Sequence, residues 1–373
     1  MNQYILYILG TFIVSLLCGF ISIPLIISFC RRRKLYDLPD ARKIHKNGVP
    51  RLGGICFIPS MIISSILMIA VFNQNAVNNE ITISLWSIYF LISIMIIYGV
   101  GLVDDIVSLG PKTKFAMQII AAALMPASGL YINNMYGFMG IYDIPYYIGA
   151  PLTVFIIVFI DNAMNLIDGI DGLSGGLSLI ALAGFMTCFA REEIWTYCIL
   201  IAGLMGVLVA FLYFNLFGDS NGRHLKIFMG DSGSLTLGFI LGFLLVKFSM
   251  DNPNVMPFRK DSLMLSCTLL AIPIFDVVRI IIVRMIHHKP LFGADKNHIH
   301  HKLLRAGLNQ HQTLATILLL AVFYIVFNYL IFGLLYFSSI VLIDIVIWIA
   351  FHMVVNIAIR KRGQEVFYIE KQK

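Results

Sequence analysis

The chain has 373 residues, of which 59% are hydrophobic and 13% are charged, and its mean hydropathy is +0.87. This composition excludes an ordinary soluble globular protein. Apolar runs of about 20 residues recur, each long enough to cross a bilayer as a helix, so the sequence predicts an all-α polytopic membrane protein. The net charge of +7 is assigned to loops on the cytoplasmic side and does not indicate nucleic-acid binding. The six cysteines lack CxxC spacing and are interpreted as small buried side chains.

Apolar length and flanking charge predict about eleven transmembrane helices. The first is longer than a signal-peptide core and lacks a small-residue cleavage site, so we expect it to be retained. In chain order, the expected spans are 4–29, 53–72, 82–103, 114–131, 148–167, 174–190, 195–217, 233–250, 262–286, 313–337 and 340–359.

Basic residues in the connecting loops predict the orientation of the chain. They concentrate in the loops after odd-numbered spans and in the tail 360–362, whereas the loops after even-numbered spans hold few. Because cytoplasmic loops carry the excess of Lys and Arg, we expect the N-terminus outside and the C-terminus in the cytoplasm. We expect one membrane-embedded domain over 1–373, with its site formed by the cytoplasmic loops 30–52, 104–114, 161–175, 218–234 and 287–312.

The polar stretch 161–172 lies between two apolar runs, where ionisable groups indicate a function. On a continuing helix, Asn162, Asn165 and Asp168 would share one face because they are spaced three residues apart. The two glycines that follow loosen the backbone and allow a ligand to approach it. We therefore expect the other polar groups of the chain to converge on this stretch.

Two adjacent carboxylates, Asp104 and Asp105, end the third predicted span. They repel each other unless a cation or a proton lies between them, and the helix dipole disfavours negative charge at a C-terminus. A solvated helix end is the alternative, and we favour a functional pair. Lys112 and Lys114 follow and could offset this charge or bind a phosphate, although Lys112 is equally well explained by membrane orientation.

The segment 230–234, Gly-Asp-Ser-Gly-Ser, opens the eighth predicted span. A helix N-terminus favours anions, and an Asp or Ser there would also serve as an ordinary N-cap. Asp231 and the side-chain carbonyl of Asn165 are hard oxygen ligands of the kind that Mg²⁺ takes together with substrate phosphates. Phe228 could stack on a base, with packing at the membrane interface as the alternative.

Three histidines, His298, His300 and His301, lie in the last predicted cytoplasmic loop beside Lys296 and Lys302. A zinc site is one interpretation, but no Cys or nearby Glu completes a tetrahedral set. Imidazoles beside lysines suit a diphosphate better, because they donate hydrogen bonds and carry charge. We therefore favour a phosphate-binding role for this loop.

A transporter is the alternative from a different class of protein, with Asp104, Asp168 and Asp276 as an ion or proton relay. Arg279 lies three residues after Asp276, so an intrahelical ion pair explains Asp276 more simply. The polar groups also cluster at one membrane face, and no pair of broken helices repeats in the two halves of the chain. These features favour an enzyme.

Taken together, the motifs resemble those of the polyprenyl-phosphate N-acetylhexosamine-1-phosphate transferases. These integral membrane enzymes move a sugar-1-phosphate from a UDP-sugar to a polyprenyl phosphate and release UMP. The resemblance runs from Asp37 to about Arg305 and depends on five motifs in family order. They are Asp-x-Pro-x-x-Arg-Lys-x-His with Pro-Arg-x-Gly-Gly, Gly-x-x-Asp-Asp, Asn-x-x-Asn-x-x-Asp-Gly-x-Asp-Gly, Gly-Asp-Ser-Gly-Ser, and His-x-His-His.

The resemblance implies roles for the residues that match the family motifs. It implies a catalytic set, a Mg²⁺ site in which Mn²⁺ could substitute, and a set that binds the nucleotide, sugar and phosphates. The lipid phosphate would either attack directly, which we favour, or attack after an aspartate has formed a covalent intermediate. The catalytic set is Asp104, Asp105 and Lys114; the metal set is Asp231 and Asn165; the substrate set is Phe228, Asp168, Asp171, Asn162, His298, His300, His301, Arg51 and His45.

The histidine motif and Arg51 resemble the N-acetylglucosamine branch of the family more than the phospho-N-acetylmuramoyl-pentapeptide branch, which has three consecutive histidines. The resemblance implies UDP-N-acetylglucosamine, or a related UDP-N-acetylhexosamine, as donor and undecaprenyl phosphate as acceptor. The product would begin a cell-envelope glycan such as O-antigen or teichoic acid. It also implies a bacterial cytoplasmic (inner) membrane location with the active site on the cytoplasmic face; a homodimer is left open.

Overall fold

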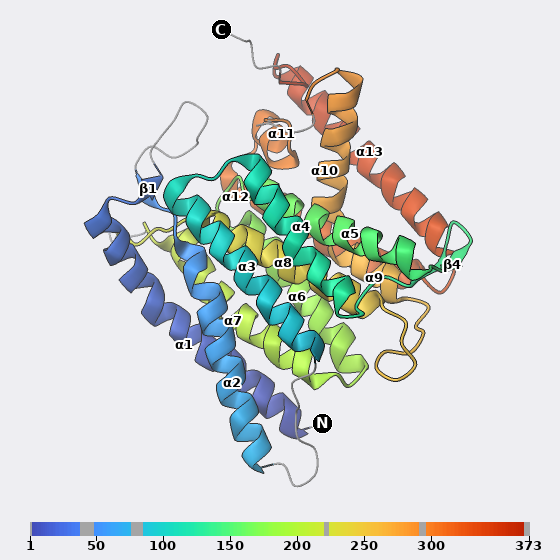
Figure 1. Cartoon of the computed structure of the whole chain (residues 1–373). Helices are drawn as coiled ribbons and strands as arrows, with labels where there is room; N and C mark the ends of the chain where they lie inside the picture. The colour runs from blue at the N-terminus through green and yellow to red at the C-terminus, as the bar shows by residue number, and fades with distance from the viewer. Residues whose placement is uncertain (1, 38–47, 76–84, 220–223, 291–295, 369–373) are drawn as a thin grey trace.

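The computed structural model describes residues 2–37, 48–75, 85–219, 224–290 and 296–368. The molecule is mostly helical (Figure 1), which confirms the all-α class. In chain order, the helices are α1 (Asn2–Arg33), η1 (Gly53–Cys56), α2 (Phe57–Asn75), α3 (Leu85–Val107), α4 (Pro111–Ala127), α5 (Tyr146–Ile167), α6 (Leu173–Arg191), α7 (Trp195–Phe217), α8 (Gly230–Ser249), α9 (Ser262–Leu269), α10 (Ala271–Ile286), α11 (Ile299–Arg305), α12 (Gln310–Ile331) and α13 (Phe337–Lys361).

Within the described residues, nine helices are long and apolar enough to cross a membrane: α1, α2, α3, α5, α6, α7, α8, α12 and α13. Two of the eleven predicted spans take a different form. The segment expected over 114–131 contains α4, which has only 17 residues. The segment expected over 262–286 is two helices, α9 and α10, because Leu270 between them leaves the helical conformation.

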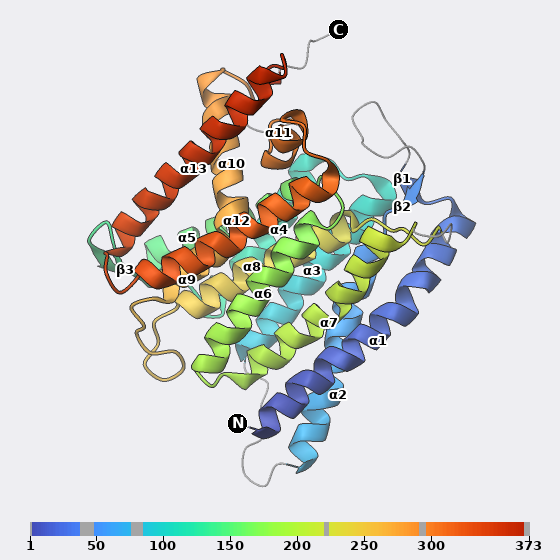
Figure 2. The same cartoon turned by 180° about the vertical axis from the view of Figure 1, so that it is seen from behind.

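The centre of the molecule is α8, in which every residue from Ser232 to Ser249 is buried. It contacts α3, α5, α6, α9 and η1, and both views show it among these helices (Figures 1 and 2). A helix that is buried on all sides cannot have a polar face, which explains its nearly continuous apolar and small residues. The position of α8 fixes the residues at its N-terminus relative to several neighbouring helices.

The outermost helices expose large apolar side chains in continuous faces. Leu6, Ile21 and Leu25 are exposed on α1, and Leu342 and Val354 are exposed on α13. A water-soluble monomer rarely exposes apolar surface on this scale, whereas a lipid bilayer solvates it. The exposed faces therefore fit a protein embedded in a membrane.

Segments far apart in the sequence meet at one end of the helix bundle. The junction of α3 and α4, the strands β1 (Tyr36–Asp37) and β2 (Val49–Pro50), and α11 all lie at the end opposite to the N-terminus (Figures 1 and 2). A second pair of strands, β3 (Asn134–Phe138) and β4 (Ile141–Asp143), forms a separate antiparallel ribbon.

The segment that leads into α8 is held by backbone hydrogen bonds to Pro50 of β2 and Gly53 of η1. The Phe228 N–H donates to the Pro50 carbonyl over 2.8 Å, and the Gly53 N–H donates to the Phe228 carbonyl over 2.9 Å. These bonds continue from the short β1–β2 ladder, in which Tyr36 pairs with Pro50. The Pro-Arg-x-Gly-Gly motif therefore lies directly against the approach to the Gly-Asp-Ser-Gly-Ser motif.

Candidate active site

The two carboxylates at the end of α3 point to different partners. Asp105 is buried and accepts hydrogen bonds from the backbone N–H groups of Asp231 over 2.8 Å and Ser232 over 2.9 Å. These groups open α8, so Asp105 acts as an anion at the positive end of that helix. The unfavourable position of Asp105 at the C-terminus of one helix is thus offset by a favourable position at the N-terminus of another.

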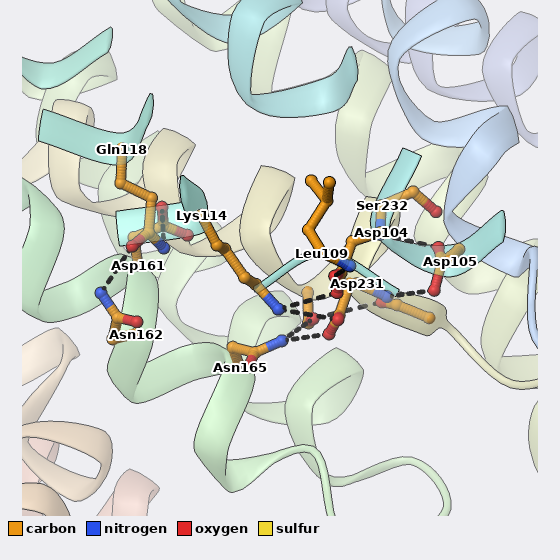
Figure 3. Close-up of polar contacts among 12 residues, drawn as sticks. Asp104, Asp105, Leu109, Lys114, Gln118, Asp161, Asn162, Asn165, Asp231 and Ser232 are labelled. Atoms are coloured by element: carbon orange, nitrogen blue, oxygen red, sulfur yellow. Dashed lines mark hydrogen bonds and ion pairs between the residues drawn. The ribbon is translucent and has the colours of Figure 1, made fainter. Parts of the chain in front are cut away.

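Asp104 faces a lysine that joins three helices (Figure 3). The Lys114 ammonium, on the first turns of α4, lies 3.0 Å from Asp104 Oδ2 and 2.7 Å from Asp231 Oδ2. The other Asp104 oxygen accepts from the Leu109 N–H over 2.6 Å. Lys114 therefore links carboxylates from α3 and α8, as expected for a cation between repelling negative charges.

Asn165 completes this group from α5. Its side-chain nitrogen donates to Asp231 Oδ1 over 2.6 Å and to Ser234 Oγ over 2.8 Å. Asp231 thus accepts hydrogen bonds from Lys114 of α4 and Asn165 of α5. Its own backbone N–H donates to Asp105 of α3. We call this group of five residues, Asp104, Asp105, Lys114, Asn165 and Asp231, the Asp–Lys cluster.

The Asp–Lys cluster contains the ligand types that Mg²⁺ prefers, namely carboxylate and carboxamide oxygens. It brings three carboxylates together with one ammonium, so bound diphosphate would meet surplus negative charge that a divalent cation can neutralise. A half-turn of the Asn165 carboxamide would direct its oxygen, instead of its nitrogen, towards Asp231. Asp231 and Asn165 would then hold Mg²⁺ as hard oxygen ligands, the remaining positions being taken by phosphate and water.

The residues assigned to the nucleotide lie just beyond the end of α5. This helix ends at Ile167, so Asp168 is its C-cap and does not continue the face shared by Asn162 and Asn165. Asp168 is exposed, and Asp171 forms an ion pair with Lys226 over 2.6 Å. The Lys226 ammonium also lies 5.7 Å from the centre of the Phe228 ring. Lys226 therefore brings Asp171 and Phe228 into one group.

Two residues that connect parts of this site, Lys226 and Asn215, were not identified from the sequence. Lys226 belongs to none of the five sequence motifs. Asn215, buried on α7, accepts from the Gly172 N–H over 2.7 Å and donates to the Ile227 carbonyl over 2.9 Å. A lone amide inside an apolar helix is costly unless it is bonded, and this was the available signal for Asn215.

The histidine motif begins α11 and is anchored to α10. Asp276 Oδ2 lies 2.8 Å from His298 Nδ1, and Asp276 Oδ1 accepts from the Ile299 N–H over 3.0 Å. The predicted pair of Arg279 with Asp276 is confirmed at 2.8 Å. Asp276 is therefore a supporting residue of the motif.

The other two histidines lie in surroundings that disfavour positive charge. His300 is buried, and its ring lies directly against the backbone of Gly169. Burial, with His298 and Arg305 nearby, lowers the pKa of His301 to about 4. His301 is therefore neutral at pH 7 and offers hydrogen bonds without the positive charge that we expected from clustered imidazoles.

The remaining predicted residues take several positions. Asn162 donates its side-chain N–H groups to Gln118 and to the Val158 carbonyl, so it faces another helix. Arg51 lies in the loop that pairs with Phe228, and His45 lies outside the described residues. In the part of the chain that the structure describes, no three His, Cys, Asp or Glu side chains form a metal-binding group.

Comparisons with known proteins agree with this arrangement. A charged site at one end of a bundle of membrane-length helices places the chain among polytopic membrane proteins with a functional polar site. The sequence pattern of glycosyl transferase family 4 matches residues 87–249, a range that holds all five residues of the Asp–Lys cluster. The chain is also similar to named bacterial enzymes over most of its length.

Three relatives illustrate this similarity. A probable undecaprenyl-phosphate N-acetylglucosaminyl 1-phosphate transferase of Bacillus subtilis is 29% identical over 366 residues, which cover 95% of this chain and 90% of the relative. A decaprenyl-phosphate N-acetylglucosaminephosphotransferase of Mycobacterium tuberculosis is 30% identical, covering 78% and 74%. The undecaprenyl-phosphate alpha-N-acetylglucosaminyl 1-phosphate transferase of Escherichia coli K12 is 28% identical, covering 77% and 74%.

The chain therefore belongs to glycosyl transferase family 4, and the family resemblance drawn from its five motifs is confirmed. It is an integral membrane protein and a phosphotransferase.

Proposed function

We propose that this protein transfers N-acetylglucosamine-1-phosphate from UDP-N-acetylglucosamine to a polyprenyl phosphate and releases UMP. The observation that carries the proposal is the Asp–Lys cluster, in which Asp104 and Asp231 share the Lys114 ammonium at the N-terminus of α8. Catalysis of phosphoryl transfer depends mainly on positioning and on neutralising charge, and the cluster provides both. The names of the relatives support the same transferred group, N-acetylglucosamine-1-phosphate, and the same class of acceptor.

In the proposed reaction, an oxygen of the lipid phosphate attacks the β-phosphorus of the UDP-sugar. A new P–O bond forms there while the bond to the bridging oxygen breaks, and UMP leaves with the electron pair. Bound Mg²⁺ would supply Lewis-acid stabilisation of the phosphate oxygens. Lys114 would offset the charge that develops on the leaving UMP, since its ammonium already lies beside Asp231, the proposed Mg²⁺ ligand.

The two adjacent aspartates have different proposed roles. Asp104 forms an ion pair with Lys114 and would border the reacting groups. It would orient the lipid phosphate and, when that phosphate is protonated, accept the proton from it. Asp105 is committed to two backbone N–H groups of α8, so it would fix the direction of Asp231. Direct attack needs no covalent aspartate, because a lipid phosphate is already a nucleophile at neutral pH.

The nucleotide and the sugar are proposed to lie beside the cluster. Phe228 and Asp171, joined by Lys226, would hold the uridine, with Asp168 exposed next to them. His300 lies against the same turn, with the centre of the His301 ring 4.2 Å from that of the His300 ring, and both would donate hydrogen bonds to the sugar or the phosphates.

The membrane arrangement proposed is eleven spans with the N-terminus outside and the C-terminus in the cytoplasm. α4 and the broken α9–α10 segment supply the two spans beyond the nine long helices. The basic loops support this orientation, which sets the Asp–Lys cluster at the cytoplasmic face of a bacterial cytoplasmic membrane.

Donor comparison with purified protein tests the proposal. We expect UMP release from UDP-N-acetylglucosamine when polyprenyl phosphate and Mg²⁺ are both present, and loss of release after chelation with EDTA that Mg²⁺ restores. Release only from UDP-N-acetylmuramoyl-pentapeptide would instead assign the protein to the other branch of the family. Release that is unaffected by EDTA would contradict the metal assignment.

A further inference from the structure

A buried polar contact joins α4 to α5 next to the Asp–Lys cluster. Gln118 is 1% exposed and donates its side-chain N–H to Asp161 Oδ2 over 2.9 Å; Asp161 is completely buried. The side-chain oxygen of Gln118 accepts from Asn162 over 3.0 Å. Both ends of the Gln118 carboxamide are thus fixed by α5, and Figure 3 shows this contact beside Lys114.

The positions of Gln118 and Asp161 along their helices relate this contact to the Asp–Lys cluster. Gln118 follows Lys114 by four residues on α4, and Asp161 precedes Asn165 by four residues on α5. Residues four apart lie on the same face of a helix, about one turn from each other. The contact therefore lies one turn deeper in the bundle than the two side chains that reach Asp231.

A third helix passes the same point at close range. A Cβ atom added at Gly238 of α8 would lie 2.6 Å from the Asp161 Cα. Gly238 follows Asp231 by seven residues, or about two turns of the same helix. The backbones of α5 and α8 consequently approach each other where Gln118 attaches α4 to α5.

We propose that the Gln118–Asp161 contact is a positioning element, which holds Lys114 and Asn165 at the spacing needed for both to reach Asp231. Neither side chain belongs to the Asp–Lys cluster, so both are positioning residues. The inference rests on the proposed function, because it assigns Lys114 and Asn165 to that reaction.

Physical considerations support a large effect from this small contact. Polar side chains within a membrane-embedded bundle are costly without partners, so a bond between them fixes its two helices at one rotation and depth. A displacement of about 1 Å in a catalytic group can lower the rate by about 10²-fold. A slight rotation of α4 would move Lys114 by such an amount while the fold is retained.

Reciprocal substitution tests the contact itself. Gln118→Glu alone places a second carboxylate against Asp161, and we expect kcat for UMP release to fall at least about tenfold. Adding Asp161→Asn restores the bond, because the new amide can donate to the new carboxylate. We expect the double variant to recover most of kcat. A double variant as slow as Gln118→Glu, or a single variant as fast as the wild type, would overturn the proposal.

A matched control separates positioning from general stability. Asn328 on α12 is also buried and donates to Asp344 Oδ2 of α13 over 2.8 Å. Asn328→Leu removes a similar intramembrane bond, and we expect a lower thermal midpoint with kcat close to that of the wild type. Gln118→Leu should lower kcat at least about tenfold with a smaller change in KM. An equal loss of kcat in both variants would show that Gln118 acts only through stability.

A second readout does not depend on activity. We expect Gln118→Leu to increase hydrogen–deuterium exchange in residues 111–117 of α4, whereas Asn328→Leu should leave that segment unchanged. Unchanged exchange in Gln118→Leu would overturn the positioning role. A wild-type protein that releases no UMP from any UDP-sugar would instead contradict the proposed function, and the exchange measurement would still test the contact.

Discussion

At the scale of single residues, two neighbouring carboxylates are assigned separate tasks by the direction in which each points. Consecutive residues of a helix are about 100° apart, so Asp104 and Asp105 point in different directions. Asp104 turns to Lys114, and Asp105 turns to the N-terminus of α8. The doublet therefore combines a carboxylate that pairs with Lys114, and that we propose borders the substrate, with a carboxylate that secures the helix carrying Asp231.

Substitution by asparagine should separate these tasks. We expect Asp104→Asn to lower the UMP-release rate by about 10²-fold or more, with little change in the thermal midpoint, because it removes a charge that borders the substrate. Asp105→Asn should lower both the rate and the thermal midpoint, because its NH₂ group would oppose one of the two N–H donors of α8. A near-normal rate for purified Asp104→Asn would contradict its assignment.

At the scale of helices, the site depends on how closely the neighbours of α8 approach it. A Cβ atom added at Gly101 of α3 would lie 2.6 Å from the Ser232 Cα. The absence of a side chain at this position lets α3 come near enough for Asp105 to bond the first turn of α8. Backbone proximity, and not only side-chain chemistry, thus sets the geometry of the Asp–Lys cluster.

Two glycines of α3 offer a matched comparison. Gly101→Ala should separate α3 from α8 and lower both the UMP-release rate, by at least about tenfold, and the thermal midpoint. Gly99→Ala should leave both close to wild type, because no atom lies within 4 Å of the added Cβ. Equal effects of the two substitutions would show that the close approach of α3 is unimportant.

At the scale of the whole molecule, the helices bring five distant segments to one end of the bundle. The polar turn after α5, the start of α8, the α3–α4 junction, α11 and the strand pair β1–β2 all lie there (Figures 1 and 2). The proposed membrane orientation makes this end cytoplasmic, where a soluble nucleotide sugar and a lipid phosphate can both reach it.

Labelling of single cysteines tests that orientation. In right-side-out vesicles, a membrane-impermeant maleimide should label Asn254→Cys, which lies exposed between α8 and α9, and should leave Lys112→Cys unlabelled. Inverted vesicles should give the reverse pattern, and the wild type, with its six cysteines, provides the background. Labelling of Lys112→Cys from the outside would overturn the proposed topology.

Much of this arrangement follows from local sequence, and the rest depends on contacts between distant residues. Apolar length and motif order are local properties, so the long helices and the members of the Asp–Lys cluster could be predicted. The bond from Gln118 to Asp161 and the ion pair from Lys226 to Asp171 join residues 43 and 55 positions apart, which no local pattern indicates. The break at Leu270 was missed because both halves of that segment are equally apolar.

The position of a labelled phosphate tests the central claim most directly. Purified protein would receive UDP-N-acetylglucosamine labelled with ³²P at the β-phosphate, together with polyprenyl phosphate and Mg²⁺. Attack at the β-phosphorus predicts that the label enters the lipid fraction in equal amount to the unlabelled UMP released. Label that remains in the aqueous phase as UDP, while the sugar enters the lipid, would mean glycosyl transfer at the sugar carbon and would contradict the proposed function.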